Sequence, residues 1–235
     1  MHFKRCANRI GFRPLVAVLT AGLVAFSLPA PANAAPDGGW KVIEFPGITP
    51  SNFVQKPDGR IDVLSDESSA MLYRPIGAGE AERRYLTWRW RVDAAPPPTD
   101  LTRRGGDRPL AVHLCFKGKE REAGFMNWMS RALRPDVEGL SPNDRCLTYI
   151  WGGDTKAGRM FPNPYMKDRG VMVILRGVDA PTGEWFIEKI DCAMDYRKAF
   201  GEEPPKPSFI AISGDSDGTK SRAAGSVAAL AFTDN

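Results

Sequence analysis

A strict alternation of apolar and polar side chains between residues 85 and 93 constrains the fold more than any other feature of the sequence. The two alternating sets are Leu86, Trp88, Trp90 and Val92 on one side and Thr87, Arg89, Arg91 and Asp93 on the other. A side-chain period of two is that of a β-strand with one buried face. Trp88 and Trp90 could stack on sugar rings, but they share their face with Leu86 and Val92. We therefore expect them in a core.

Other short segments also have strand character, and turn signals such as Pro57-Asp58-Gly59 separate them. These segments are 40–45, 52–56, 60–65, 69–74, 110–116, 146–151, 171–175, 185–190, 209–213 and 227–232. Long helices that alternate with strands, as in a parallel α/β sheet, are missing from this pattern. The sequence therefore predicts an all-β fold, an antiparallel β-sandwich with one or two short helices.

Two segments have helical character. Residues 120–133 place apolar side chains at helical spacing and stop before Pro135. Residues 191–200 end at Gly201, a typical helix C-cap. The first helix belongs to an insertion, residues 118–145, which we expect either to cap one end of the sandwich or to form a lid over a site.

The N-terminus, residues 1–34, has the features of a secretory signal. Four basic residues and no acidic ones precede an apolar stretch, and Ala32-Asn33-Ala34 fits a cleavage site. A retained membrane anchor is the alternative, but the apolar stretch is shorter than the roughly 20 residues that a spanning helix needs. We expect cleavage to leave one domain, residues 35–235, without a transmembrane segment, in the bacterial periplasm or the medium.

Charge and histidine content exclude several functions. The full chain has 32 basic and 28 acidic residues. Loss of the four basic residues of the signal leaves the two signs balanced, which disfavours binding to nucleic acid or to anionic lipid. Of the two histidines, only His113 remains. A zinc site built from several histidines is thereby excluded.

Three cysteines remain in the expected mature chain: Cys115, Cys146 and Cys192. An exported protein is expected to form disulfides, and an odd number leaves one thiol free. Cys115 ends one predicted strand and Cys146 begins the next, so the two would lie opposite each other if these strands pair. Cys146 with Cys192 is the competing pair.

Several short motifs follow one another in a recognisable order: 86–92, 105–107, 147–152, 195–201 and 215–219. In this order they resemble the DUF3047 family of exported bacterial proteins, over essentially the whole mature chain. The chain departs from the family at Arg91, where Lys is more common, and at Arg108, where a second Asp is more common. The resemblance implies a sandwich of the jelly-roll or carbohydrate-binding-module type, and it implies no activity.

Two groups of polar residues are candidates for binding. Arg89 and Arg91 point away from the predicted core, and His113 and Glu188 would join them if the neighbouring strands pair with theirs. This face would bind a carboxylated sugar or another small anion, or it is only a solvated face with weak ion pairs. The second group is the acidic turn 215–219 together with Asp107.

The segment 215–219 is a compact acidic turn. Asp215 and Asp217, with Asp107 from the Gly-Gly-Asp motif, offer the oxygen ligands that Ca²⁺ prefers. The alternative is a turn in which aspartate side chains bond backbone N–H groups. A structural Ca²⁺ is the one cofactor that the sequence suggests.

Three functions remain open. The first is a non-catalytic module that binds a carbohydrate or envelope glycan. The second is an envelope hydrolase, which would need His113 or two converging acids, drawn for instance from Glu188, Asp191 and Asp195. The third is an interaction or structural module with an envelope protein as its partner, for which the apolar side chains of 125–129 are the candidate surface. We expect the first, without catalysis.

Overall fold

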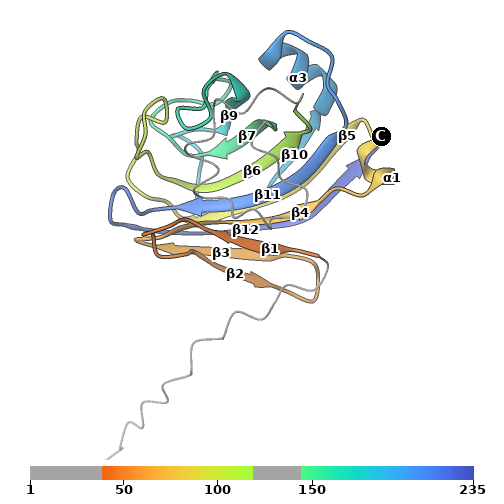
Figure 1. The fold of residues 1–235 in the computed structure, drawn as a ribbon. Helices are drawn as coiled ribbons and strands as arrows, with labels where there is room; N and C mark the ends of the chain where they lie inside the picture. The colour runs from red at the N-terminus through yellow and green to blue at the C-terminus, as the bar shows by residue number, and fades with distance from the viewer. Residues whose placement is uncertain (1–38, 119–143) are drawn as a thin grey trace, which may run out of the picture. The chain divides into compact units, whose positions relative to one another are not determined.

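The computed structural model describes residues 39–118 and 144–235, and these fold into two β-sheets (Figure 1). The seven-stranded sheet has the order β1-β4-β11-β6-β7-β9-β8. Its strands are Lys41–Glu44, Ser69–Pro75, Pro207–Asp215, Arg108–Phe116, Arg145–Trp151, Gly170–Arg176 and Met160–Pro162. The five-stranded sheet has the order β10-β5-β12-β3-β2. Its strands are Phe186–Asp191, Tyr85–Ala94, Arg222–Thr233, Ile61–Asp66 and Asn52–Gln55.

The core lies between the two sheets. In β5 the even-numbered residues predicted to face a core are all buried, and Trp88 and Trp90 are 1% and 0% exposed. In β6, Val112 and Leu114 join the same core cluster, whereas His113 and Cys115 between them do not. The alternation of β5 and β6 thus gives each sheet one face in the core, which confirms the predicted β-sandwich.

Among the described strands, neighbours run antiparallel with one exception. β7 and β9 pair in parallel, with Leu147 opposite Val171 and Tyr149 opposite Val173. A parallel pair cannot be joined by a tight hairpin. The chain between them, residues 152–169, forms the edge strand β8 and the short 3-10 helix Lys167–Arg169. This connection supplies part of the site described below.

The predicted helix after β10 is present as α3, Cys192–Phe200. Asp191 caps its first turn by accepting a hydrogen bond from the Met194 N–H at 3.0 Å, and Gly201 ends it in the left-handed conformation with φ 72°. One short helix, α1 (Ala78–Ala81), was not predicted. The predicted signal, residues 1–34, and the predicted helix 120–133 lie outside the described residues. In the described part of the chain, no helix has the length and apolar character to cross a membrane.

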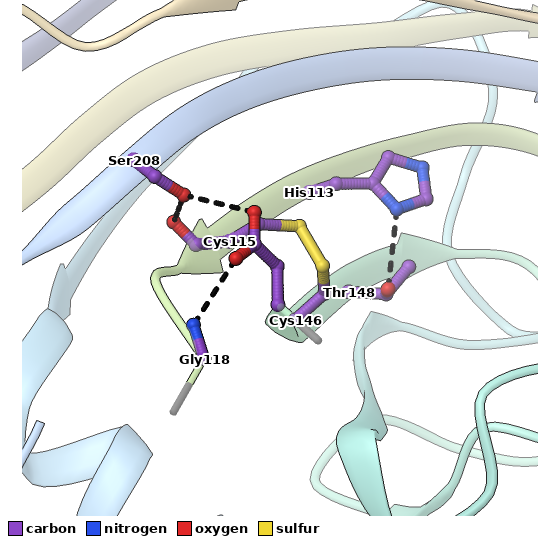
Figure 2. Close-up of a disulfide and its surroundings, with 7 residues drawn as sticks. His113, Cys115, Gly118, Cys146, Thr148 and Ser208 are labelled. Atoms are coloured by element: carbon purple, nitrogen blue, oxygen red, sulfur yellow. Dashed lines mark hydrogen bonds between the residues drawn. A yellow bond between two sulfur atoms is a disulfide. The ribbon is translucent and has the colours of Figure 1, made fainter. Parts of the chain in front are cut away.

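A disulfide joins Cys115 to Cys146, as the predicted strand ends suggested (Figure 2). The two residues lie opposite each other in the β6–β7 ladder, and 31 residues of sequence separate them. Cys192 has a free thiol buried in the core between the sheets, on the other side of the seven-stranded sheet. The competing pair of Cys146 with Cys192 is therefore wrong.

Loss of this disulfide should lower stability. Closing a loop of this length restricts the unfolded chain, so we expect the Cys115→Ala/Cys146→Ala variant to lose about 3 to 4 kcal/mol of unfolding free energy. Urea denaturation of the mature chain measures it. Reducing agent should bring the wild type to the level of the double variant and leave the double variant unchanged. Equal midpoints for oxidised and reduced wild type would contradict the prediction.

Candidate functional site

A pocket of about 360 Å³ lies on the face of the seven-stranded sheet that is turned away from the five-stranded sheet. We call this the pocket face. Its floor is formed by alternate residues of β4, β11 and β6, among them Met71, Phe209 and His113. These strands are neighbours, so side chains that point away from the core converge there. The volume is within the range of small-ligand sites.

The pocket has an apolar wall and a polar end. The wall is made of residues before β2, of residues on the sheet, and of the connection between β7 and β9. Its apolar members are Ile43, Phe45, Pro46, Ile48, Met71, Met166, Met172, Phe209 and the Cys115–Cys146 disulfide. The polar lining residues are Ser69, Asp107, Arg108, Asn163, Tyr165, Asp215 and Asp217, and the three aspartates lie with Arg108 and Ser69 at one end, the polar end. Pockets of this composition bind ligands that have an apolar surface and a few hydrogen-bonding groups.

Strand register positions the polar end. Asp215 closes β11 opposite Ser69 of β4 on one side and Arg108 of β6 on the other. Arg108 Nη1 lies 3.0 Å from Asp215 Oδ2. Tyr165, from the connection between β7 and β9, accepts a hydrogen bond from the Gly105 N–H at 2.6 Å. The segment before β6 is thereby tied to the pocket wall.

Asp107 holds the acidic turn that follows β11. Its carboxylate accepts hydrogen bonds from the backbone N–H of Gly218 at 3.0 Å, from the N–H of Thr219 at 2.6 Å and from the Thr219 hydroxyl. The two segments approach so closely that a Cβ at Gly218 would lie 2.4 Å from the Gly105 carbonyl oxygen. The turn is therefore held by an aspartate from another segment of the chain.

Asp215 is the most perturbed acid of this cluster. Its side chain is buried, and burial raises the pKa of its carboxyl to about 7. The charge of Arg108 acts against burial and lowers this pKa, whereas a side-chain hydrogen bond with Asp217 and the charge of Asp217 raise it further. Asp215 Oδ1 is buried without a hydrogen-bond partner among residues 39–118 and 144–235. At neutral pH this carboxyl is poised between its two protonation states.

The structure brings together the three residues predicted to bind calcium. One oxygen each from Asp107, Asp215 and Asp217 lies within 4.8 Å of the others. Asp107 already accepts N–H and O–H bonds, and Arg108 already supplies a positive charge to Asp215. Ca²⁺ takes six to eight oxygen ligands, and the apolar wall adds none. The geometry thus favours the hydrogen-bonded turn, and calcium stays a prediction.

His113 lines the pocket, and each of its two ring nitrogens lies within hydrogen-bond distance of a neighbouring hydroxyl. Its Nε2 lies 2.8 Å from Ser213 Oγ. Its Nδ1 lies 3.2 Å from Thr148 Oγ1 (Figure 2). Burial lowers the pKa of the imidazole to about 3, and the charge of Arg108 contributes in the same direction. The ring is neutral at physiological pH, and because both nitrogens are engaged it can contact a ligand only by packing.

The predicted cluster of Arg89, Arg91, His113 and Glu188 is not formed. Strands β5 and β6 belong to different sheets, so the two arginines and His113 lie on opposite outer faces of the sandwich. Arg89 and Arg91 lie over the ring of Trp185, at 4.9 and 5.3 Å from its centroid. The premise that these strands are neighbours was wrong. Binding of an anion by the two arginines stays a prediction.

Glu188 lies at the edge of the core instead. It accepts hydrogen bonds from Trp90 Nε1 at 2.9 Å and from Arg176 Nε at 2.7 Å. Asp191 caps α3, and Asp195 accepts a hydrogen bond from the Tyr149 hydroxyl at 3.1 Å. Each of these three acids therefore has its own structural partner, and the structure does not gather them in a cleft.

The fold and the pocket define the chain as a two-sheet β-sandwich with a pocket on one outer face. The chain belongs to the DUF3047 family: the model of that family, described as protein of unknown function (DUF3047), matches residues 38–231. The resemblance noted in the sequence is thereby confirmed. A comparison with curated proteins gave no match.

Among solved structures, the chain is similar to the xyloglucanase domain of NopAA, a type three effector from Sinorhizobium fredii, in complex with cellobiose. The two are 10% identical, and the TM-score is 0.46. The match covers 83% of this chain and 93% of that one.

Proposed function

We propose that the protein is an exported, non-catalytic module that binds a carbohydrate of the cell envelope in the pocket. The observation that carries this proposal is the pairing of an apolar wall with a polar end in one cavity. Apolar and aromatic side chains such as Phe45 and Phe209 suit the C–H faces of sugar rings, and Asn163 and Asp217 suit their hydroxyl groups. The Cys115–Cys146 disulfide supports export to an oxidising compartment.

Two features of the site speak for binding rather than catalysis. A general base works best with a pKa near the working pH, whereas burial holds the pKa of His113 at about 3. Asp215 is 9% exposed and one of its oxygens is engaged with Arg108, so it is poorly placed to attack a glycosidic carbon.

A glycan array probed with purified residues 35–235 tests the proposal. We expect at least one class of saccharide to bind, and Asp217→Asn to weaken that binding at least tenfold, because it removes a charged acceptor at the polar end. The matched control is Asp179→Asn, a surface aspartate outside the pocket that should leave binding unchanged. A blank array would contradict the proposal, and loss of binding in Arg89→Ala alone would move the site to the five-stranded sheet.

The same array, run with Ca²⁺ and with a chelator, tests the metal. We propose that Asp107 holds the acidic turn without an ion, so binding should be the same in both conditions. A signal that the chelator abolishes and added Ca²⁺ restores would assign the three aspartates to calcium instead.

A hydrolase is the second candidate, and one observation favours it. Asp215 has a pKa near 7 beside Asp217, and the oxygens of the two lie within 4.8 Å. The carboxyl groups of retaining glycosidases stand about 5 to 5.5 Å apart. Incubation of any array ligand with the protein, followed by an assay for new reducing ends, tests this function. Hydrolysis that Asp217→Asn removes while binding persists would replace the binding module with the enzyme.

A further inference from the structure

The pocket also indicates what kind of group the bound carbohydrate carries. We infer that this carbohydrate is joined to an aliphatic chain, as in a glycolipid, and that the chain lies along the apolar wall. The inference rests on the proposed function and narrows it to envelope saccharides with an alkyl or acyl group. Three features of the pocket support it: its length, the chemistry of its wall and the small polar capacity of its lining.

The pocket is long in the direction that crosses the seven-stranded sheet. Its lining begins at Ile43 of β1, includes Met71 of β4, Phe209 of β11 and Cys115 of β6, and reaches Met172 of β9. In the order of the sheet, five strand-to-strand steps separate β1 from β9. At the usual strand spacing the lining therefore extends over about 24 Å along the sheet. A cavity of this length suits a linear group better than one compact ring.

The wall offers few hydrogen-bonding groups. Its side chains are mainly flexible aliphatic or thioether groups: Ile43, Ile48, Met71, Met166 and Met172. A thioether sulfur is only a weak acceptor, and methionine adapts its shape to irregular apolar surfaces. A row of sugar rings along this wall would bury hydroxyl groups and would not replace the hydrogen bonds that they make with water, which is unfavourable. Methylene groups make no such bonds, so the wall favours an aliphatic chain.

Most of the polar side chains that line the pocket are already engaged within the protein. Those with a hydrogen bond or ion pair to another residue are His113, Asp107, Arg108, Asp215, Asn163 and Tyr165. Ser69 and Asp217 complete the polar lining among the described residues. The lining can therefore satisfy only a few polar groups of a ligand. A head group of one sugar matches this capacity better than an oligosaccharide.

The charge of the polar end favours a glycolipid over a free fatty acid as the source of the chain. The charged side chains of the described lining are Asp107, Asp215, Asp217 and Arg108. A carboxylate head would meet like charge from the aspartates and only one guanidinium in return. A sugar head is neutral, and its hydroxyl groups can donate hydrogen bonds to carboxylate oxygens.

Calorimetric titration of the mature protein with glucose, hexyl β-glucoside and octyl β-glucoside tests the inference, at concentrations at which no micelles form. The three compounds share one head group and differ only in the chain. Each methylene that enters an apolar site raises the affinity about fourfold. We therefore expect octyl glucoside to bind at least tenfold more tightly than hexyl glucoside. Binding of the octyl compound should also show a negative heat-capacity change, because it buries apolar surface.

A variant of the wall distinguishes the pocket from other apolar surface. Ile48→Asn places an amide in the lining and should reduce the tenfold gain to threefold or less. The matched control is Val178→Asn, at an exposed apolar residue outside the lining, and it should keep the full gain. Thermal melting checks that both variants fold; if Ile48→Asn does not fold, Ile48→Ala replaces it, with a smaller reduction expected. An equal loss of the gain in both variants, or in neither, would overturn the inference.

Two further octyl compounds identify the source of the chain. Octyl tetraethylene glycol has a neutral head without a sugar, and octanoate has a carboxylate. We expect both to bind more weakly than octyl glucoside, because neither places sugar hydroxyl groups at the polar end. Tighter binding of octanoate would assign the pocket to a fatty acid and overturn the inference.

The outcomes separate the inference from the proposed function. Equal binding of glucose, hexyl glucoside and octyl glucoside overturns the inference and leaves the carbohydrate module in place. If octyl glucoside and octyl tetraethylene glycol bind equally and the glycan array is blank, the aliphatic chain stands and the carbohydrate function falls. If none of the compounds binds, the inference is overturned, and the array alone decides the function.

Discussion

Replacement of Trp90 with alanine is expected to lower the free energy of unfolding by about 3 to 5 kcal/mol, the range for deletion of a large buried aromatic side chain. Trp90 is 0% exposed and packs edge to face against Trp88 and Trp151, with ring centroids 5.5 and 5.6 Å apart. These contacts connect the two sheets, because Trp90 belongs to β5 and Trp151 to β7. Urea denaturation followed by tryptophan fluorescence and far-UV circular dichroism measures the loss.

The two tryptophans of β5 provide a matched control. Trp90 donates a hydrogen bond to Glu188, whereas the indole N–H of Trp88 is buried without a partner in the described regions. Replacement of each by phenylalanine keeps most of the ring and removes the N–H. We therefore expect Trp90→Phe to cost about 1 to 2 kcal/mol more than Trp88→Phe. Equal costs would show that the bond to Glu188 contributes nothing to stability.

Removal of Asp215 is expected to make the protein markedly more sensitive to acid. His113 has a folded-state pKa of about 3, below its ordinary 6.5, because it is buried. Below pH 6.5 the unfolded state therefore binds a proton more readily than the folded state does. As a result, the free energy of unfolding falls as the pH drops below 6.5. Asp215 acts in the opposite direction. Burial raises its pKa from 3.8 to about 7, so its contribution is largest below pH 3.8 and is lost as the pH rises through 7.

Between pH 4 and 6.5 the two contributions nearly cancel in the wild type. In Asp215→Asn only the contribution of His113 remains. The free energy of unfolding of this variant should therefore fall by about 3 kcal/mol relative to the wild type between pH 6.5 and pH 4. His113→Gln should show the reverse, a relative gain toward acid. Denaturation curves at half-unit pH steps measure both. Parallel profiles for wild type and Asp215→Asn would contradict the assigned pKa shift.

Much of the fold was predictable because local patterns carry it. The alternation in β5 gave the correct face for every residue from Leu86 to Val92, and the cap residues gave the bounds of α3 to within one residue. The disulfide was predictable from the end of one strand and the start of the next strand along the chain. Strand β8 was missed because three residues are too few for a period to be recognised.

The site was only partly predictable, and the reason is topological. A side-chain period assigns a residue to a face of its strand, but it does not assign the strand to a sheet. His113 was correctly placed opposite the core, yet it was grouped with Arg89, which lies on the other sheet. The meeting of Asp107 with Asp215 and Asp217 was anticipated, and the β6–β11 ladder explains it. The apolar wall was missed, since its members come from strands and a connection far apart in sequence.

The parallel pairing of β7 and β9 has a consequence for how the lining of the pocket can be changed. The detour that it requires, residues 152–169, brings Asn163, Tyr165 and Met166 to the pocket and leaves these three out of the core between the sheets. Substitutions at Asn163 and Tyr165 would alter the lining of the pocket without changing the core between the sheets, whereas Met166 also packs in a buried cluster with Phe209 and the disulfide. Residues 163–166 are therefore a suitable segment for redesign. A library of substitutions there would alter the shape of the pocket and leave the core between the sheets unchanged.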